Sequence, residues 1–194
     1  MNEVTFTLLL SQKKLPESWC DTLFQQVPRP TQAHLFCLDQ ATHLLHADFA
    51  GLPPGERLYC AHGHRQLSAP EPPEHSPFVA SSLVNLGALI RASHATFSIP
   101  HSHWSGKTGT LGVKNIGILL GALQDTQAES IRLATGLAAC NHAVTLYTPL
   151  SPAELRQQLP ETATLLEALL ALRAVFKTAP SDALPGKHEV LLQL

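Results

Sequence analysis

The stretch Asn115-Ile116-Gly117-Ile118-Leu119-Leu120 decides the fold that the sequence predicts. It is a short apolar run that closely resembles Val4–Leu10, near the start of the chain. Each run is followed by a helical pattern and then by a second apolar run, at His34–Leu38 in the first half and Ala143–Tyr147 in the second. Strands that alternate with helices through short connections favour a parallel sheet with helices on both faces. The pattern therefore predicts an α/β fold in which the first half of the chain is repeated in the second.

The remaining elements of the first half follow from the same patterning. Proline fits the first turn of a helix and serine caps its free N–H groups, so both residue types mark helix starts. We expect helices over Pro16–Val27, Gln40–Ala47 and 81–93, further strands over Arg57–Ala61 and Ala95–Ile99, and a proline-rich loop over Ser68–Pro77.

Two capping boxes mark helix starts in the second half. In a capping box a hydroxyl and a carboxylate three residues later satisfy each other's backbone N–H groups. We expect a helix from the box Thr126–Glu129 to about Asn141, a helix from the box Ser151–Glu154, a helix after Pro160 with Leu165, Leu169, Leu172 and Phe176 on one stripe, and a last strand over His188–Leu194.

These elements predict two copies of one α/β unit, over residues 1–104 and 113–194. The second unit is expected to be shorter, because no strand equivalent to Arg57–Ala61 follows its second strand. A single mixed sheet of about eight strands is the alternative, since α/β proteins repeat strand–helix units by construction.

The composition limits the classes of function. Hydrophobic residues make up 44% of the chain and charged residues 14%, which suits a packed core rather than a disordered chain. The net charge of −2 gives no basic surface for nucleic acid. The start Met1–Val4 is acidic, unlike a secretory signal, and the apolar stretch Ile116–Leu123 is shorter than the ~20 residues that cross a bilayer. We expect a soluble cytoplasmic protein that binds neither nucleic acid nor a membrane.

Cys60, within Leu58–His64, is the residue most suited to carry chemistry. It ends a predicted strand, and open α/β sheets bind ligands beyond the carboxyl ends of their strands. Sulfur chemistry needs the thiolate, and so it needs a group that lowers the thiol pKa from about 8.5. His62 and His64 would supply positive charge, and Gly63 allows a tight turn between them. We expect a catalytic site of Cys60, His62 and His64; a buried structural cysteine followed by a polar loop is the alternative.

The histidines also allow a metal site. His62 and His64 form one His-x-His pair, His101 and His103 form another, and both pairs follow predicted strands. In a parallel sheet both loops emerge at the same edge, where the pairs and Cys60 would offer the three or four N and S ligands that zinc requires. Solvated loop histidines are the alternative to this site. The main prediction contains no metal and no cofactor.

Gly106-Lys107-Thr108 has the appearance of a phosphate-binding loop. That motif requires a glycine where this chain has His101, and a helix after the lysine that aims its N–H groups at phosphate. Here a glycine-rich connector and a strand come next, so we expect no nucleotide site in this segment.

The other three cysteines are predicted to be structural. Cys37 lies inside a strand, and Cys20 and Cys140 lie on helices, in the core or at an interface. The four cysteines include no CxxC pair, which suggests free thiols in a reducing compartment.

A strand ending in cysteine (Leu58-Tyr59-Cys60-Ala61), a helix over Ser81–Ile90 and a returning strand over Ala95–Pro100 form one series. This series resembles the DsrE/DsrF-like sulfur-relay proteins, the family that includes TusB, TusC and TusD. Residues 115–121, with 129–147, are similar to the opening strand, helix and strand of the same domain. The chain thus looks like two fused DsrE-like units, the second without the cysteine.

The resemblance implies a mainly parallel α/β sheet in tandem units of the flavodoxin or Rossmann type, and assembly into homo- or hetero-oligomers. It also implies a strand-end cysteine that carries sulfur as a persulfide. By position that cysteine is Cys60, which would take sulfur from a donor protein and pass it to an acceptor thiol without a cofactor. The chain would then be sulfurtransferase-like. A non-catalytic DsrE-like subunit that binds partners is the first alternative, and a Cys/His metal-binding protein is the second.

Overall fold

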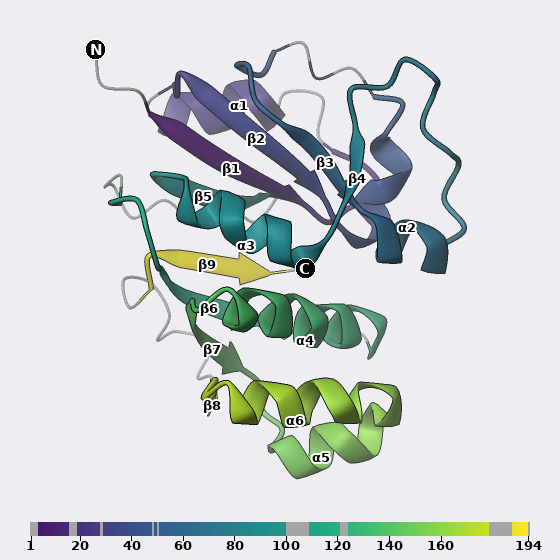
Figure 1. The fold of residues 1–194 in the computed structure, drawn as a ribbon, viewed down its shortest axis with the longest axis vertical. Coiled ribbons are helices and arrows are strands. Elements are labelled where there is room, and N and C mark those ends of the chain that lie inside the picture. Colours follow the sequence, from purple (N-terminus) through teal and green to yellow (C-terminus); the bar gives the residue numbers. More distant parts are fainter. Residues whose placement is uncertain are drawn as a thin grey trace. The chain divides into compact units, whose positions relative to one another are not determined.

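The computed structural model describes residues 4–15, 19–27, 29–47, 49, 51–99, 109–120, 124–178 and 188–193. The chain divides into two compact units, Met1–Gly112 and Val113–Leu194. Each unit contains its own sheet, and every strand pair in both sheets is parallel (Figure 1). The predicted α/β class is therefore confirmed. Two separate sheets are present where the alternative prediction placed a single mixed sheet.

The first unit has a five-stranded sheet in the order β4-β3-β2-β1-β5. Its elements are β1 (Thr5–Leu10), α1 (Trp19–Gln26), β2 (Gln32–Cys37), the 3₁₀ helix η1 (Asp39–Leu44), β3 (Arg57–Cys60), α2 (Ala61–Gln66), β4 (Val79–Ser81), α3 (Leu83–Arg91) and β5 (Ala95–Ile99). Both β5 and the start of α3 agree with the prediction, and Ser82 caps α3 through a hydrogen bond from Asn85 N. Two elements were missed: the short strand β4, and α2, where a loop was predicted.

Helices cover both faces of this sheet. Leu8 and Leu10 of β1 belong to the same buried cluster as Leu23 of α1, which places them on the α1 face. Alternation along the strand then turns Leu9 to the opposite face, where α3 contributes the fully buried Leu86. Figure 1 shows α1 and α3 on opposite sides of the sheet. The apolar run at the start of the chain is thus a central strand that is buried on both faces.

The second unit has a four-stranded sheet in the order β8-β7-β6-β9. Its elements are β6 (Asn115–Leu119), α4 (Gln124–Ala139), β7 (Ala143–Tyr147), α5 (Pro152–Gln158), the 3₁₀ helix η2 (Pro160–Thr162), α6 (Ala163–Ala171), β8 (Val175–Lys177) and β9 (Val190–Gln193). None of the helices in the described part of the chain combines the length and the apolar character that a membrane crossing requires.

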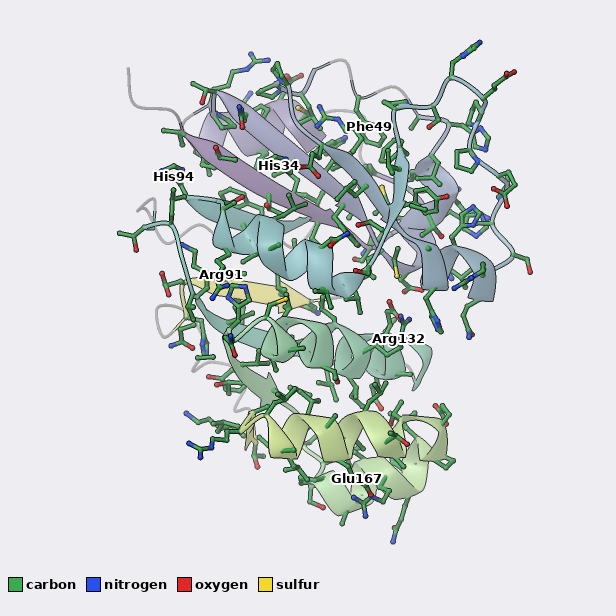
Figure 2. The ribbon with its side chains drawn as sticks, viewed as in Figure 1. His34, Phe49, Arg91, His94, Arg132 and Glu167 are labelled. Carbon is green, nitrogen blue, oxygen red and sulfur yellow. The ribbon has the colours of Figure 1, made fainter. Side chains whose placement is uncertain are left out.

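The two units share the way in which the last strand closes onto the first. In the first unit His94 N donates to Thr5 O at 2.8 Å, and Thr5 N donates back to His94 Nδ1 at 3.1 Å. In the second unit Glu189 N donates to Asn115 O at 3.0 Å, and Asn115 N donates to Glu189 Oε2 at 2.9 Å. His94 lies just before β5 (Figure 2). A side chain ahead of the last strand thus caps the first strand in both units.

The expectation that the second unit has no third strand is wrong. β8 pairs with β7 as β3 pairs with β2. The predicted leucine stripe does not reach Phe176, because α6 ends earlier: Arg173 has a left-handed backbone (φ 61°). Arg173 N donates to Leu170 O and Ala174 N donates to Leu169 O, which is the Schellman arrangement that closes a helix. Phe176 therefore belongs to a strand, although that strand contains no cysteine.

Only one of the two predicted capping boxes forms. At Ser151–Glu154 both reciprocal hydrogen bonds are present, with Pro152 at the first helical position. At Thr126–Glu129 the prediction is wrong, because α4 already begins at Gln124 and Thr126 lies inside the helix. The Thr126 carbonyl accepts a hydrogen bond from Ser130 Oγ at 2.7 Å, as a residue within a helix does.

Gly55 provides a test of the packing beside β2. A Cβ at Gly55 would overlap the carbonyl oxygen of Ala33 and lie 2.6 Å from its carbonyl carbon. We expect Gly55→Ala to lower the free energy of unfolding of the first unit by about 1–3 kcal/mol, because backbone cannot move aside cheaply. Urea unfolding followed by tryptophan fluorescence reports on this unit through Trp19, which lies on α1 and packs against Phe49.

Gly51→Ala is the matched control. A Cβ there would meet Cys20 Sγ at 3.6 Å, an ordinary contact. Equal unfolding midpoints for the Gly55 and Gly51 variants would contradict the steric argument.

The capping box of α5 predicts a pH dependence. The Ser151 hydroxyl and N–H donate to Glu154 Oε2 at 2.7 and 2.8 Å, and these hydrogen bonds, the hydroxyl's first, lower the pKa of Glu154 below its ordinary 4.5. Because the folded pKa is the lower one, the cap stabilises α5 above pH 4.5 and is lost as the pH falls through the folded pKa. Amide-exchange protection of residues 152–158 should therefore be higher in wild type than in Glu154→Gln at neutral pH and should converge in acid. A difference that is independent of pH would contradict this.

Candidate functional site

Cys60 is the last residue of β3 and the N-cap of α2. Its extended backbone (φ −70°, ψ 106°) ends the strand, and its Sγ accepts a hydrogen bond from Gly63 N at 3.5 Å. Cys60 pairs with Ser81 across the β3–β4 ladder, so it stands at the carboxyl edge of a parallel sheet, where the sequence placed it. Its residue surface is only 1% exposed. In place of the predicted loop that presents the sulfur to solvent, a helix begins directly after Cys60, and the residue is buried.

Gly63 packs α2 against the start of η1, which follows β2. The position of its missing Cβ lies 3.6 Å from Asp39 N and 3.8 Å from Cys60 Cβ, within ordinary contact distance. Asp39 itself has a left-handed backbone (φ 50°), which turns the chain out of β2 beside Cys60. Gly63 lies inside a helix rather than at the predicted tight turn.

His64 is buried, with 5% of its surface exposed. Its Nε2 lies 3.1 Å from the carbonyl oxygen of Pro70, and since a carbonyl only accepts, Nε2 is the donor. Its ring lies 5.1 Å from the ring of Tyr59, the residue before Cys60. His64 therefore anchors α2 to the chain on either side of it.

His62 and His64 point away from α2 in different directions. His62 is exposed, whereas His64 is buried. Residues two apart on a helix point in different directions, so the helical backbone of α2 separates the two rings. For both histidines to face the sulfur, as predicted, residues 62–64 would have to form a loop, whereas they lie in α2. The contacts of His64 are with Pro70 and Tyr59.

The structure describes only some of the residues in the predicted metal site. His101 and His103 lie outside the described residues, as does the Gly106-Lys107-Thr108 segment. Among the described residues, no group of three or more His, Cys, Asp or Glu side chains is arranged to hold a metal ion. The site with both His-x-His pairs stays a prediction.

The other cysteines differ in burial. Cys37 is fully buried in β2, as predicted, and burial raises the pKa of its thiol. Cys20 on α1 is half-buried; burial, and then the charge of Asp21, raise its pKa. Cys140, directly after α4, is also half-buried. All four cysteines are free thiols.

Two features were not found by sequence reasoning. A groove of about 400 Å³ lies over β3, β4 and α3, where Leu58, Val79 and Leu89 line it together with Asn85. It was missed because β4 is too short to leave a pattern in the sequence. The second feature is a chain of hydrogen bonds across the sheet of the second unit.

In that chain Tyr147 Oη donates to His188 Nε2 at 2.7 Å, and His188 Nδ1 donates to Asn115 Oδ1 at 2.8 Å. The His188 ring lies over Gly117, where a Cβ would come within 2.7 Å of it. His188 is 41 positions from Tyr147 and 73 positions from Asn115 in the sequence, and the three residues lie on or beside three different strands. No local motif therefore marks them.

The arrangement at Cys60 therefore offers one sulfur atom and one backbone donor, with a buried histidine that holds the helix in place. A hydrogen bond to sulfur is stronger when the sulfur carries negative charge, so Gly63 N–H suits a thiolate or a persulfide anion. No family model matches the chain, and no curated protein or solved structure matches it either.

The cap geometry predicts how substitutions of Cys60 affect stability. Serine is a preferred N-cap residue and can accept the same hydrogen bond from Gly63 N, whereas alanine cannot. We expect Cys60→Ala to lower the free energy of unfolding by about 1 kcal/mol and Cys60→Ser to lower it less. Urea unfolding followed by tryptophan fluorescence measures both. Should the alanine variant prove the more stable of the two, Sγ is not a functioning cap.

Proposed function

We propose that this chain carries sulfur as a persulfide on Cys60 and passes it to an acceptor thiol. The observation that carries the proposal is the position of Cys60: its sulfur lies at the carboxyl edge of a parallel sheet and accepts a hydrogen bond from Gly63 N. Open α/β sheets bind their ligands at this edge. A backbone N–H that is already directed at the sulfur would also support the negative charge of a persulfide.

The transfer needs no cofactor and no net oxidation. The Cys60 thiolate attacks the outer sulfur of a donor persulfide, and a new S–S bond forms as the donor's own S–S bond breaks. The electron pair of the broken bond leaves with the donor's inner sulfur as a thiolate. An acceptor thiolate then attacks the outer sulfur on Cys60, which returns the Cys60 thiolate and completes the cycle.

The resemblance of residues 58–100 to DsrE-like proteins supports this proposal. In such a protein the partners are a sulfur donor and an acceptor in the cytoplasm, and the chain works within an oligomer. The shared strand order and the shared cap at the last strand support a reading of the two units as tandem DsrE-like copies. In that interpretation the second copy has a third strand, β8, which contains no cysteine.

A non-catalytic subunit is the second candidate. The burial of Cys60 favours it, because a residue that is 1% exposed cannot meet a donor in this conformation. The second unit also exposes three large apolar side chains close together in sequence, Leu170, Leu172 and Val175, each more than 40% exposed. Such a group suits contact with another protein.

Intact-mass analysis after treatment with glutathione persulfide tests the proposal. We expect the wild-type protein to gain one sulfur atom, and peptide mapping to place it on Cys60, because this sulfur has a backbone donor for the anion. Cys60→Ser is the control, since it keeps the cap and removes the acceptor. Sulfur found only on Cys20 or Cys140, equally in both proteins, would reject the carrier and favour the subunit.

A further inference from the structure

We propose that α2 is a latch over Cys60, held closed by His64, which opens while the rest of the first unit stays folded. The inference rests on the proposed function only in that it names the regulation of the same site. The closed state is the one observed: Cys60 is 1% exposed, and its sulfur is held in the N-cap of the helix. A donor persulfide therefore needs an opening to reach Sγ, and α2, whose Gly63 contacts both Sγ and Cβ of Cys60, is the element placed to provide it.

Burial within α2 is confined to Gly63 and His64. Gly63 has no side chain, so His64 contributes the only buried side chain with which this helix is attached. The remaining positions of α2 are half-buried or exposed. A helix of six residues is unstable on its own, because nucleation costs more than so few hydrogen bonds return. The position of α2 therefore depends on its tertiary contacts, to which His64 contributes the buried side chain and Gly63 a close approach to Asp39.

The contacts of His64 reach in two directions. Its Nε2 donates to Pro70 O, which ties α2 to the loop that follows, and its ring packs against Tyr59, which ties α2 to β3. Tyr59 belongs to the core and is anchored by pairing with Cys37 in β2. Tyr59 is thus the fixed side of the latch, and α2 with the Pro70 loop is the side that moves.

The strands beneath α2 do not depend on His64. β3 is paired with β2 on one edge and with β4 on the other. Local openings of weakly held segments cost less than global unfolding, so the latch can open while this sheet stays intact. Opening then exposes Cys60 but leaves Cys37, which is fully buried in β2, inaccessible.

Time-resolved alkylation with iodoacetamide and peptide mapping tests the latch in the full-length protein. Cys60 reports opening of α2, and Cys37 reports opening of the sheet. In wild type we expect Cys60 to react faster than Cys37. We expect His64→Ala to raise the Cys60 rate about tenfold, the effect of losing a hydrogen bond and a packed side chain, with the Cys37 rate unchanged.

The matched control is Gln66→Ala, which removes an exposed side chain from the end of the same helix and should leave both rates unchanged. His64→Gln keeps an N–H donor for Pro70 O and loses the ring, so its Cys60 rate should fall between those of wild type and His64→Ala. This second variant also serves if the alanine variant does not fold.

Two results would overturn the latch. If the Cys60 and Cys37 rates rise together in both His64 variants, the histidine stabilises the whole unit instead. If Cys60 is no faster in either variant, His64 does not hold the helix. Alkylation requires no persulfide, so the latch can stand even if Cys60 gains no sulfur; equally, sulfur transfer that does not depend on His64 leaves the carrier proposal intact and rejects the latch.

Discussion

The pairing of β1 on both of its edges is the constraint on which the first unit depends. All six residues of β1 are buried, so every backbone N–H and C=O group must find a partner within the protein. β2 pairs with one edge and β5 with the other, and both run parallel to β1. A parallel neighbour cannot be reached by a tight turn, so each connection must cross a face of the sheet. The helices α1 and α3 lie on opposite faces for this reason, and β3 is left with its carboxyl end at the edge where Cys60 stands.

The second unit also has a central strand that is paired on both edges, but it contains fewer elements. β6 is paired with β7 and β9, and its Ile116 and Ile118 are fully buried. In each unit the residue before the last strand caps the first strand with its side chain, although one unit uses a histidine and the other a glutamate. An imidazole nitrogen and a carboxylate oxygen can both accept a backbone hydrogen bond. The two units thus share this hydrogen bond but not the type of residue that accepts it. For this reason the shared feature could not be seen by comparing the two halves of the sequence.

The sequence predicted those elements whose stability is local or deeply buried. Ala95–Ile99 and Ala143–Tyr147 have the predicted bounds because they are apolar runs that end at polar residues or proline. The three-residue strands β4 and β8 were missed, because a segment of that length becomes a strand only when a neighbour pairs with it. The end of α6 was missed for a related reason. Arg173 adopts a left-handed backbone that glycine usually provides, so the sequence carries no stop signal there.

For the candidate site, the sequence predicted the place of the sulfur but not its surroundings. A cysteine after an apolar run indicates the end of a strand, whereas its burial depends on where the following residues go. Gly63 and two histidines are poor helix formers, so α2 depends on tertiary contacts: those of His64 with Tyr59 and Pro70, and that of Gly63 with Asp39. The same N–H of Gly63 that closes the helix onto Cys60 is the donor that a persulfide would use. In the closed state this N–H holds Sγ, and the carrier and latch proposals together require a second state in which α2 has moved and Sγ is open to a partner.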